Sequence, residues 1–160
     1  STLEIINGEF TGTIPSFSEN TLLRNIDLNN NDLTVLTPLQ TRNLINLNVR
    51  LNSISIIPNL DGAPNLRNIN MSQQSESVDV TYTNGAFRNL SRLREINLQN
   101  NNIKTSDIDN IIRDLYNVYD QYGRTSVTVI LSGNEPPSSN EEIQYFLRVL
   151  RRDGNWSIST

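Results

Sequence analysis

The chain has 160 residues with 13 basic and 17 acidic side chains, a formal net charge of −4, and neither cysteine nor histidine. These absences exclude disulfides, histidine or cysteine zinc sites, and serine–histidine or cysteine–histidine catalytic pairs. The acidity and the spread of basic residues along the chain argue against a nucleic-acid surface, and no apolar run approaches the roughly 20 residues that span a bilayer.

The first predicted elements are short strands that belong to a repeat. Residues 23–33 follow the pattern apolar-x-x-apolar-x-apolar-x-x-Asn-x-apolar, which recurs at 44–54 and 93–103 and begins again at 66–71. Residues 3–10 fit as a copy entered partway. The alternation suits a strand with one buried face, and the Asn can bond backbone groups in a buried bend. Stacked copies predict a parallel sheet.

The return segments between the first strands are short. The third apolar positions are 23, 21, 22 and 27 residues apart, at Ile5, Leu28, Val49, Met71 and Leu98. The first three steps leave no room for a helix and predict extended or single-turn 3₁₀ segments. Pro38 and Pro58 suit such segments, because they join no hydrogen-bonded ladder there.

The third copy departs from the pattern. Gln74 stands where Asn is expected, and a further strand-like stretch follows up to Tyr82, before an Asn84-Gly85 turn signal. The bulge at residues 73–83 is interpreted either as a tolerated insertion or as a binding loop.

Two helices are expected in the last third of the chain. Ser106 is placed as the cap of a helix that runs to Tyr122 and ends at Gly123, followed by a strand at 127–131. A capping box of Ser139 and Glu142 begins a final helix, which Gly154 ends before a closing strand at 156–158.

The repeat resembles the leucine-rich repeat. The proline-containing return segments resemble the short repeats of bacterial internalin-like proteins, and the helical ending resembles leucine-rich-repeat modules of bacterial surface proteins and phages. The resemblance implies an α/β leucine-rich-repeat solenoid of about six coils, with residues 1–160 as one domain. Its first repeat is incomplete and residues 139–160 form a capping helix and strand. The parallel sheet is concave, and the convex side is 3₁₀ or irregular early and α-helical late.

Polar columns are expected on the concave sheet, and they supply the candidate ligand-binding residues. The first column holds Asn25, Asn46, Asn68 and Glu95; the second holds Asp27, Asn48, Asn70 and Asn97; the third holds Asn29, Arg50, Ser72 and Gln99. Packing does not require their amide character. Two hypotheses stay open: hydrogen-bonded ladders that stabilise the stack, or donors and acceptors for a polar ligand.

Two edges of the solenoid are also candidates. Leu3, Ile5 and Phe10 are expected to lie uncovered at the first coil, where a preceding domain, another subunit or self-assembly would cover them. Arg24, Arg67 and Arg94 share one position before their strands, as a solvated rim or as an anion-binding ridge.

The predicted function is non-enzymatic recognition of a protein or glycan ligand at a bacterial or viral surface. No catalytic residue, metal ligand or cofactor site is found, and neither nucleic-acid binding nor membrane insertion is expected. The alternative is a structural subunit that contacts its neighbours through ends and edges. The expected location is extracellular, on a cell surface or on a virion, with a cytoplasmic location left open.

Overall fold

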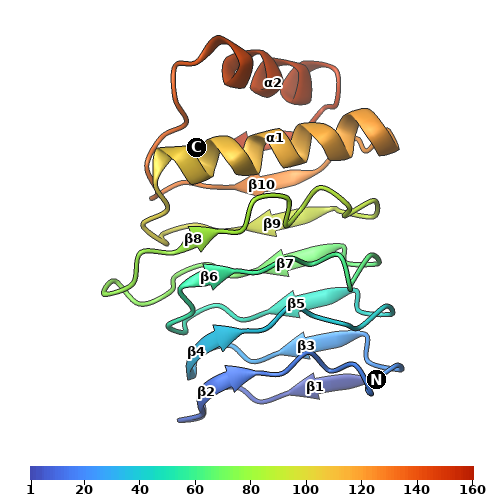
Figure 1. Ribbon diagram of the computed structural model, residues 1–160, viewed down its shortest axis with the longest axis vertical. Coiled ribbons are helices and arrows are strands. Elements are labelled where there is room, and N and C mark those ends of the chain that lie inside the picture. The colour runs from blue at the N-terminus through green and yellow to red at the C-terminus, as the bar shows by residue number, and fades with distance from the viewer.

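The computed structural model describes residues 1–160, which form a parallel β-solenoid with two helices (Figure 1). Seven strands build one parallel sheet in chain order, so each coil lies on the one before it. They are β1 (Thr2–Glu4), β3 (Asn25–Asp27), β5 (Asn46–Asn48), β7 (Asn68–Asn70), β9 (Glu95–Asn97), β10 (Thr128–Ile130) and β11 (Ser157–Ser159). The predicted parallel-sheet solenoid is confirmed.

The strand registers follow the sequence repeat. The central residues of successive strands pair in the order Leu3, Ile26, Leu47, Ile69, Ile96, Val129 and Ile158. The steps between them are 23, 21, 22, 27, 33 and 29 residues. The five inner members are buried, whereas Leu3 and Ile158 at the two ends are partly exposed. Because side chains alternate along a strand, the flanking polar residues point away from the core.

The opposite layer changes from strands to helices along the chain (Figure 1). Strands β2 (Thr11–Ile14) and β4 (Asp32–Leu36) pair with each other, as do β6 (Ile56–Ile57) and β8 (Thr81–Tyr82). These return segments are extended and contain no 3₁₀ helix. The longer coils that follow carry α1 (Thr105–Tyr122) and α2 (Glu141–Arg152), which pack on each other.

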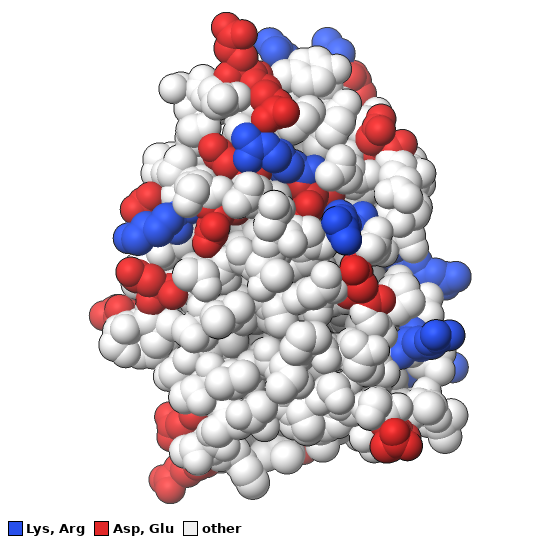
Figure 2. Space-filling model, viewed as in Figure 1, with Lys and Arg blue, Asp and Glu red and all other residues white.

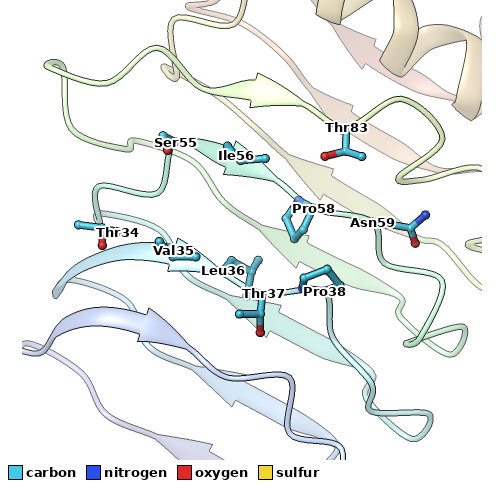
Figure 3. Close-up of a pocket in the computed structure, with 10 residues that line it drawn as sticks. All are labelled: Thr34, Val35, Leu36, Thr37, Pro38, Ser55, Ile56, Pro58, Asn59 and Thr83. Atoms are coloured by element: carbon cyan, nitrogen blue, oxygen red, sulfur yellow. The ribbon is translucent and has the colours of Figure 1, made fainter.

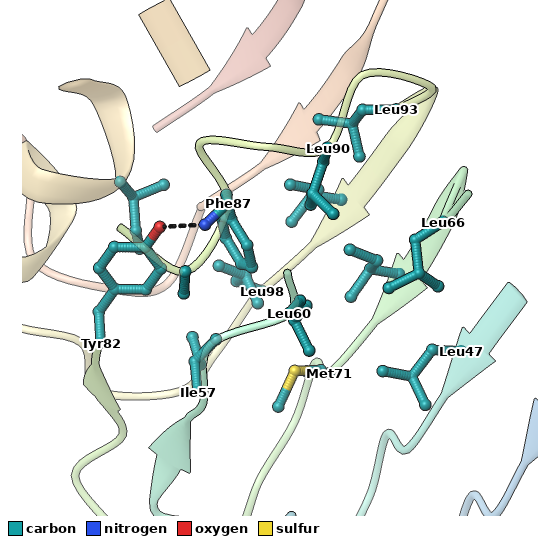
Figure 4. Close-up of a cluster of buried hydrophobic side chains, with 14 of the residues drawn as sticks. Leu47, Ile57, Leu60, Leu66, Met71, Tyr82, Phe87, Leu90, Leu93 and Leu98 are labelled. Carbon is teal, nitrogen blue, oxygen red and sulfur yellow. Dashed lines mark hydrogen bonds between the residues drawn. The ribbon is translucent and has the colours of Figure 1, made fainter. Parts of the chain in front are cut away.

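One core of 38 buried hydrophobic residues fills the space between the layers. Figure 4 shows its middle part, where Met71 and Leu98 from the sheet side face Ile57 and Phe87 from the return segments. This continuous core joins the strand coils to the helical coils.

Buried amides close the turns after β3, β5, β7 and β9, at Asn31, Asn52, Gln74 and Asn101. Asn52 donates from Nδ2 to the carbonyl oxygens of Leu28 in the coil before and Val49 in its own coil, both at 3.0 Å. Its Oδ1 accepts the Leu33 N–H at 3.0 Å. Gln74 repeats this pattern with Val49, Met71 and Ile54, at 3.0, 3.2 and 2.9 Å. Gln74 therefore makes the same kinds of hydrogen bond as the Asn of the other turns, and the third copy keeps the repeat.

The first helix begins differently from the prediction. Its N-cap is Lys104, which makes no side-chain cap bond, so the expected Ser106 cap is wrong. The Glu135 carboxylate, from the next coil, accepts the Thr105 N–H at 2.8 Å instead. That bond and the nearby Lys104 ammonium at 3.3 Å lower the pKa of Glu135. Gly123 ends the helix in the left-handed conformation, as predicted.

The last helix begins one residue later than predicted. Asn140 is the N-cap, and its side chain accepts the Glu142 N–H at 2.9 Å, so the Ser139–Glu142 capping box is wrong. The Asn140 side chain caps the N–H of the second helical residue, in place of the cap expected from Ser139. The helix lays Ile143, Leu147 and Leu150 on the core, and β11 closes the sheet.

Candidate functional site

The first concave column is a hydrogen-bonded ladder. Asn46 donates from Nδ2 to Asn25 Oδ1 at 2.6 Å, and Asn68 donates to Asn46 Oδ1 at the same distance. Asn25 itself donates to the Thr2 hydroxyl at 3.0 Å. The ladder stops at Glu95, which forms no hydrogen bond with Asn68. These amides therefore bond to one another up the stack.

The second column makes local turns at the strand ends. A side-chain oxygen of each residue accepts the N–H two residues further on, at 3.1 to 3.4 Å, in Asp27, Asn48, Asn70 and Asn97. Such turns favour Asn and Asp because their short side chains reach the backbone. The expectation that packing gives these residues no need for an amide or carboxylate is wrong.

Arg50 is the exception in the third column. Its Nη2 donates to Gln73 Oε1 at 2.9 Å, and no carboxylate lies within ion-pair distance. Its Nε is the only buried side-chain nitrogen or oxygen in the molecule without a hydrogen-bond partner. Ser72 and Gln99, the neighbouring members of the column, are a hydroxyl and an amide. The concave face thus carries one cation whose hydrogen bonding is incomplete.

A polar hollow adjoins this position. Residues 73–76 of the predicted bulge, together with Leu51, Asn100, Asn102 and Gly133, surround a volume of about 750 Å³ at the ends of the strands. The side chain of Gln73 joins it to Arg50. The predicted bulge is thus divided: its first residues line a hollow, whereas its last residues enter the fold.

Tyr82 fixes the second half of the bulge to α1. Its hydroxyl donates to Asp114 Oδ2 at 2.5 Å and accepts the Phe87 N–H at 2.9 Å, the latter drawn in Figure 4. Its backbone N–H donates to Asp107 Oδ2 at 2.9 Å. Burial, and then the Asp114 carboxylate, raise the pKa of Tyr82 well above its ordinary value. This segment is structural.

A second groove lies on the convex side, between β4 and β6, which do not pair (Figure 3). Val35 and Pro38 form one wall and Ile56 and Pro58 the other, around a volume of about 380 Å³. Val35 is 46% exposed and Ile56 53% exposed. Sequence reasoning missed this groove, although two apolar residues at outward positions of return strands were a visible signal.

The three residues of the predicted N-terminal edge lie close together. Leu3, Ile5 and Phe10 line a hollow of about 240 Å³ that reaches the core residues Ile14 and Leu33. Phe10 is 55% exposed. The strand β1 pairs only with β3, so its outer edge has no partner.

Comparisons with protein-family models, with curated proteins and with solved structures found no match to this chain. Neither helix is both long and apolar enough to cross a membrane, and no three acidic side chains come together as a metal site would require. The fold and surfaces define a class, a parallel β-solenoid whose seven-stranded sheet carries polar side chains on its outer face.

Proposed function

We propose that the chain is a leucine-rich-repeat recognition module that binds a protein or glycan, without catalysis, on its concave sheet at a bacterial or viral surface. The spacing of the repeat and the buried amides in the turns after β3, β5, β7 and β9 support the family assignment. The unsatisfied Nε of Arg50 supports the location of the binding site. Candidate ligand contacts around it are Asn48, Asn70, Asn97 and Gln99.

The chemistry of Arg50 favours a ligand rich in acceptor oxygens. A buried N–H without a partner costs free energy, which a ligand oxygen would recover. The guanidinium offers a planar fork of donors that suits a carboxylate or paired carbonyl oxygens. Rotation of Arg50 away from Gln73 would present that fork above the sheet, and the fixed Asn turns beside it would supply further polar contacts.

The experiment is a binding screen of the labelled chain against a glycan array and a panel of purified surface proteins. Arg50→Gln is expected to weaken binding to the true ligand by about tenfold or more. Arg148→Gln, on α2, is the matched control, because Arg148 is exposed and forms no ion pair. Ligands that bind the Arg50→Gln and wild-type chains equally would contradict the proposal.

A structural subunit is the second candidate function. The observation that favours it is the open hollow at Leu3, Ile5 and Phe10, where core residues of the first coil meet solvent. In a stack, a second copy or a preceding coil would bury these side chains and pair with the outer edge of β1.

A further inference from the structure

Arginines that are far apart in the sequence gather on one rim of the solenoid. Arg24, Arg67 and Arg94 directly precede β3, β7 and β9, and Arg92 and Arg124 lie in the turns beside them. In Figure 2 blue side chains gather on the right margin, the side where the strands begin in Figure 1. The spread of basic residues along the sequence thus hides a cluster, because stacking superimposes equivalent positions.

The cluster lines two adjoining hollows. Arg67, Arg92, Arg94 and Arg124 are the only residues around the first, which has a volume of about 280 Å³. Arg24 takes part in the second, of about 230 Å³, which shares Arg67 and Arg92 with the first. The two hollows therefore form one continuous basic rim.

None of the four ion pairs of the molecule involves the five arginines of this rim. Arg124 alone forms side-chain hydrogen bonds, to the Leu93 carbonyl oxygen at 3.2 and 2.8 Å. Four guanidinium groups around one hollow repel one another, and an anion between them would relieve that repulsion. In a chain of net charge −4, such a concentration is not a by-product of overall basicity.

The geometry points to a sulfated polysaccharide bound along this rim. Guanidinium forks bind sulfate oxygens in pairs. The rim extends over four strand steps, from β3 to β10, or about 19 Å at the usual strand spacing, so it matches a ligand whose anionic groups recur. No aromatic side chain lines either hollow, which leaves nucleobases without a stacking partner.

This site is independent of the proposed concave site. The rim lies where the strands begin, whereas Arg50 follows the end of β5. The two sites share no residue, so loss of binding after Arg50→Gln says nothing about the rim.

The test measures binding of heparin and of chemically desulfated heparin over a series of salt concentrations. The wild-type chain is expected to bind heparin and not the desulfated polymer. Arg94→Gln is expected to weaken heparin binding about tenfold and to reduce the salt slope by about one. Arg94→Lys, which keeps the charge but loses the fork, is expected to give an intermediate loss.

Arg148→Gln is the control, since it removes the same charge from an exposed arginine on α2. It is expected to bind heparin as the wild type does, and circular dichroism checks that each variant is folded. Absence of heparin binding at low salt would overturn the proposal, as would equal losses in Arg94→Gln and Arg148→Gln. Equally tight binding of single-stranded DNA of the same charge would overturn the choice of ligand.

Discussion

Single buried amides connect neighbouring coils at the turns after β3, β5, β7 and β9. Asn52 bonds the coil before it, its own coil and the N–H of Leu33, and only 4% of its surface is exposed. The concave amide Asn68 differs, since it is exposed and makes one ladder bond to Asn46. The same residue type therefore has two energetic roles.

Asn52→Ala is expected to lower the free energy of unfolding by about 4 kcal/mol, because several buried backbone groups lose their partners at once. Asn68→Ala is expected to cost within about 1 kcal/mol, since water replaces its bond. Urea denaturation of both variants measures the difference. Equal losses of unfolding free energy in the two variants would show that the buried bonds of Asn52 contribute no more than the exposed bond of Asn68.

For single residues, the sequence predicts those roles that depend on neighbours close by in the chain. The Asn of each turn follows from the repeat, because the bend and its partners lie within a few residues of each other. The unsatisfied Nε of Arg50 and the rim around Arg67 do not follow, since they depend on side chains from different coils. Gln74 was expected to depart from the repeat pattern. Only the folded turn shows that its longer side chain reaches the same kinds of backbone group as the Asn of the other turns.

Among the elements, β8 and α1 are joined by a buried polar contact that no sequence pattern announces. Tyr82 on β8 bonds Asp114 on α1, 32 residues away, and both side chains are buried. The cap of α1 is likewise distant, because Glu135 comes from the following coil. Helix existence and the Gly123 stop were predictable from periodicity, but these partners required the three-dimensional arrangement.

Tyr82→Phe is expected to lower the free energy of unfolding by about 3 kcal/mol, because Asp114 and the Phe87 N–H both lose their bond to the hydroxyl. It should also change the pH dependence. In the unfolded chain Tyr82 ionises near its ordinary pKa of 10.0, whereas burial keeps it protonated in the folded protein. The wild type therefore loses stability as pH rises above that value.

Urea denaturation below and above pH 10.0 measures this loss for the wild type and for Tyr82→Phe. The variant should show a smaller alkaline decline, since its side chain cannot ionise. Asp114→Asn is the control: it keeps an oxygen that can accept the hydroxyl bond and should be less destabilising. Identical alkaline declines in wild type and Tyr82→Phe would exclude Tyr82 as their source.

For the whole molecule, the two ends of the stack differ. The last coil carries α2, which lays Ile143, Leu147 and Leu150 on the core, whereas the first coil leaves Leu3, Ile5 and Phe10 around an open hollow. The parallel stacking of the strands in chain order was predictable from the repeat. The convex groove at Val35 and Ile56 was not, because it arises where two pairs of return strands fail to join.

If the structural-subunit alternative holds, the chain self-associates through its open end. Sedimentation velocity over a range of concentrations should then show larger species, and Phe10→Glu should leave only monomer, because a buried charge would oppose the contact. Val35→Glu, at an exposed apolar residue of a separate surface, is the control and should still associate. A wild-type chain that stays monomeric at every concentration would contradict this alternative.

The order of the sheet, in which every coil touches only its immediate neighbours, has a mechanical consequence. A force that draws the two ends of the molecule apart acts on all the interfaces between coils in series, so the weakest interface gives way first. The molecule would then lengthen in steps, each releasing the 21 to 33 residues between paired strands, or roughly 70 to 110 Å of extended chain. Attached by its ends, such a stack would act as an extensible tether.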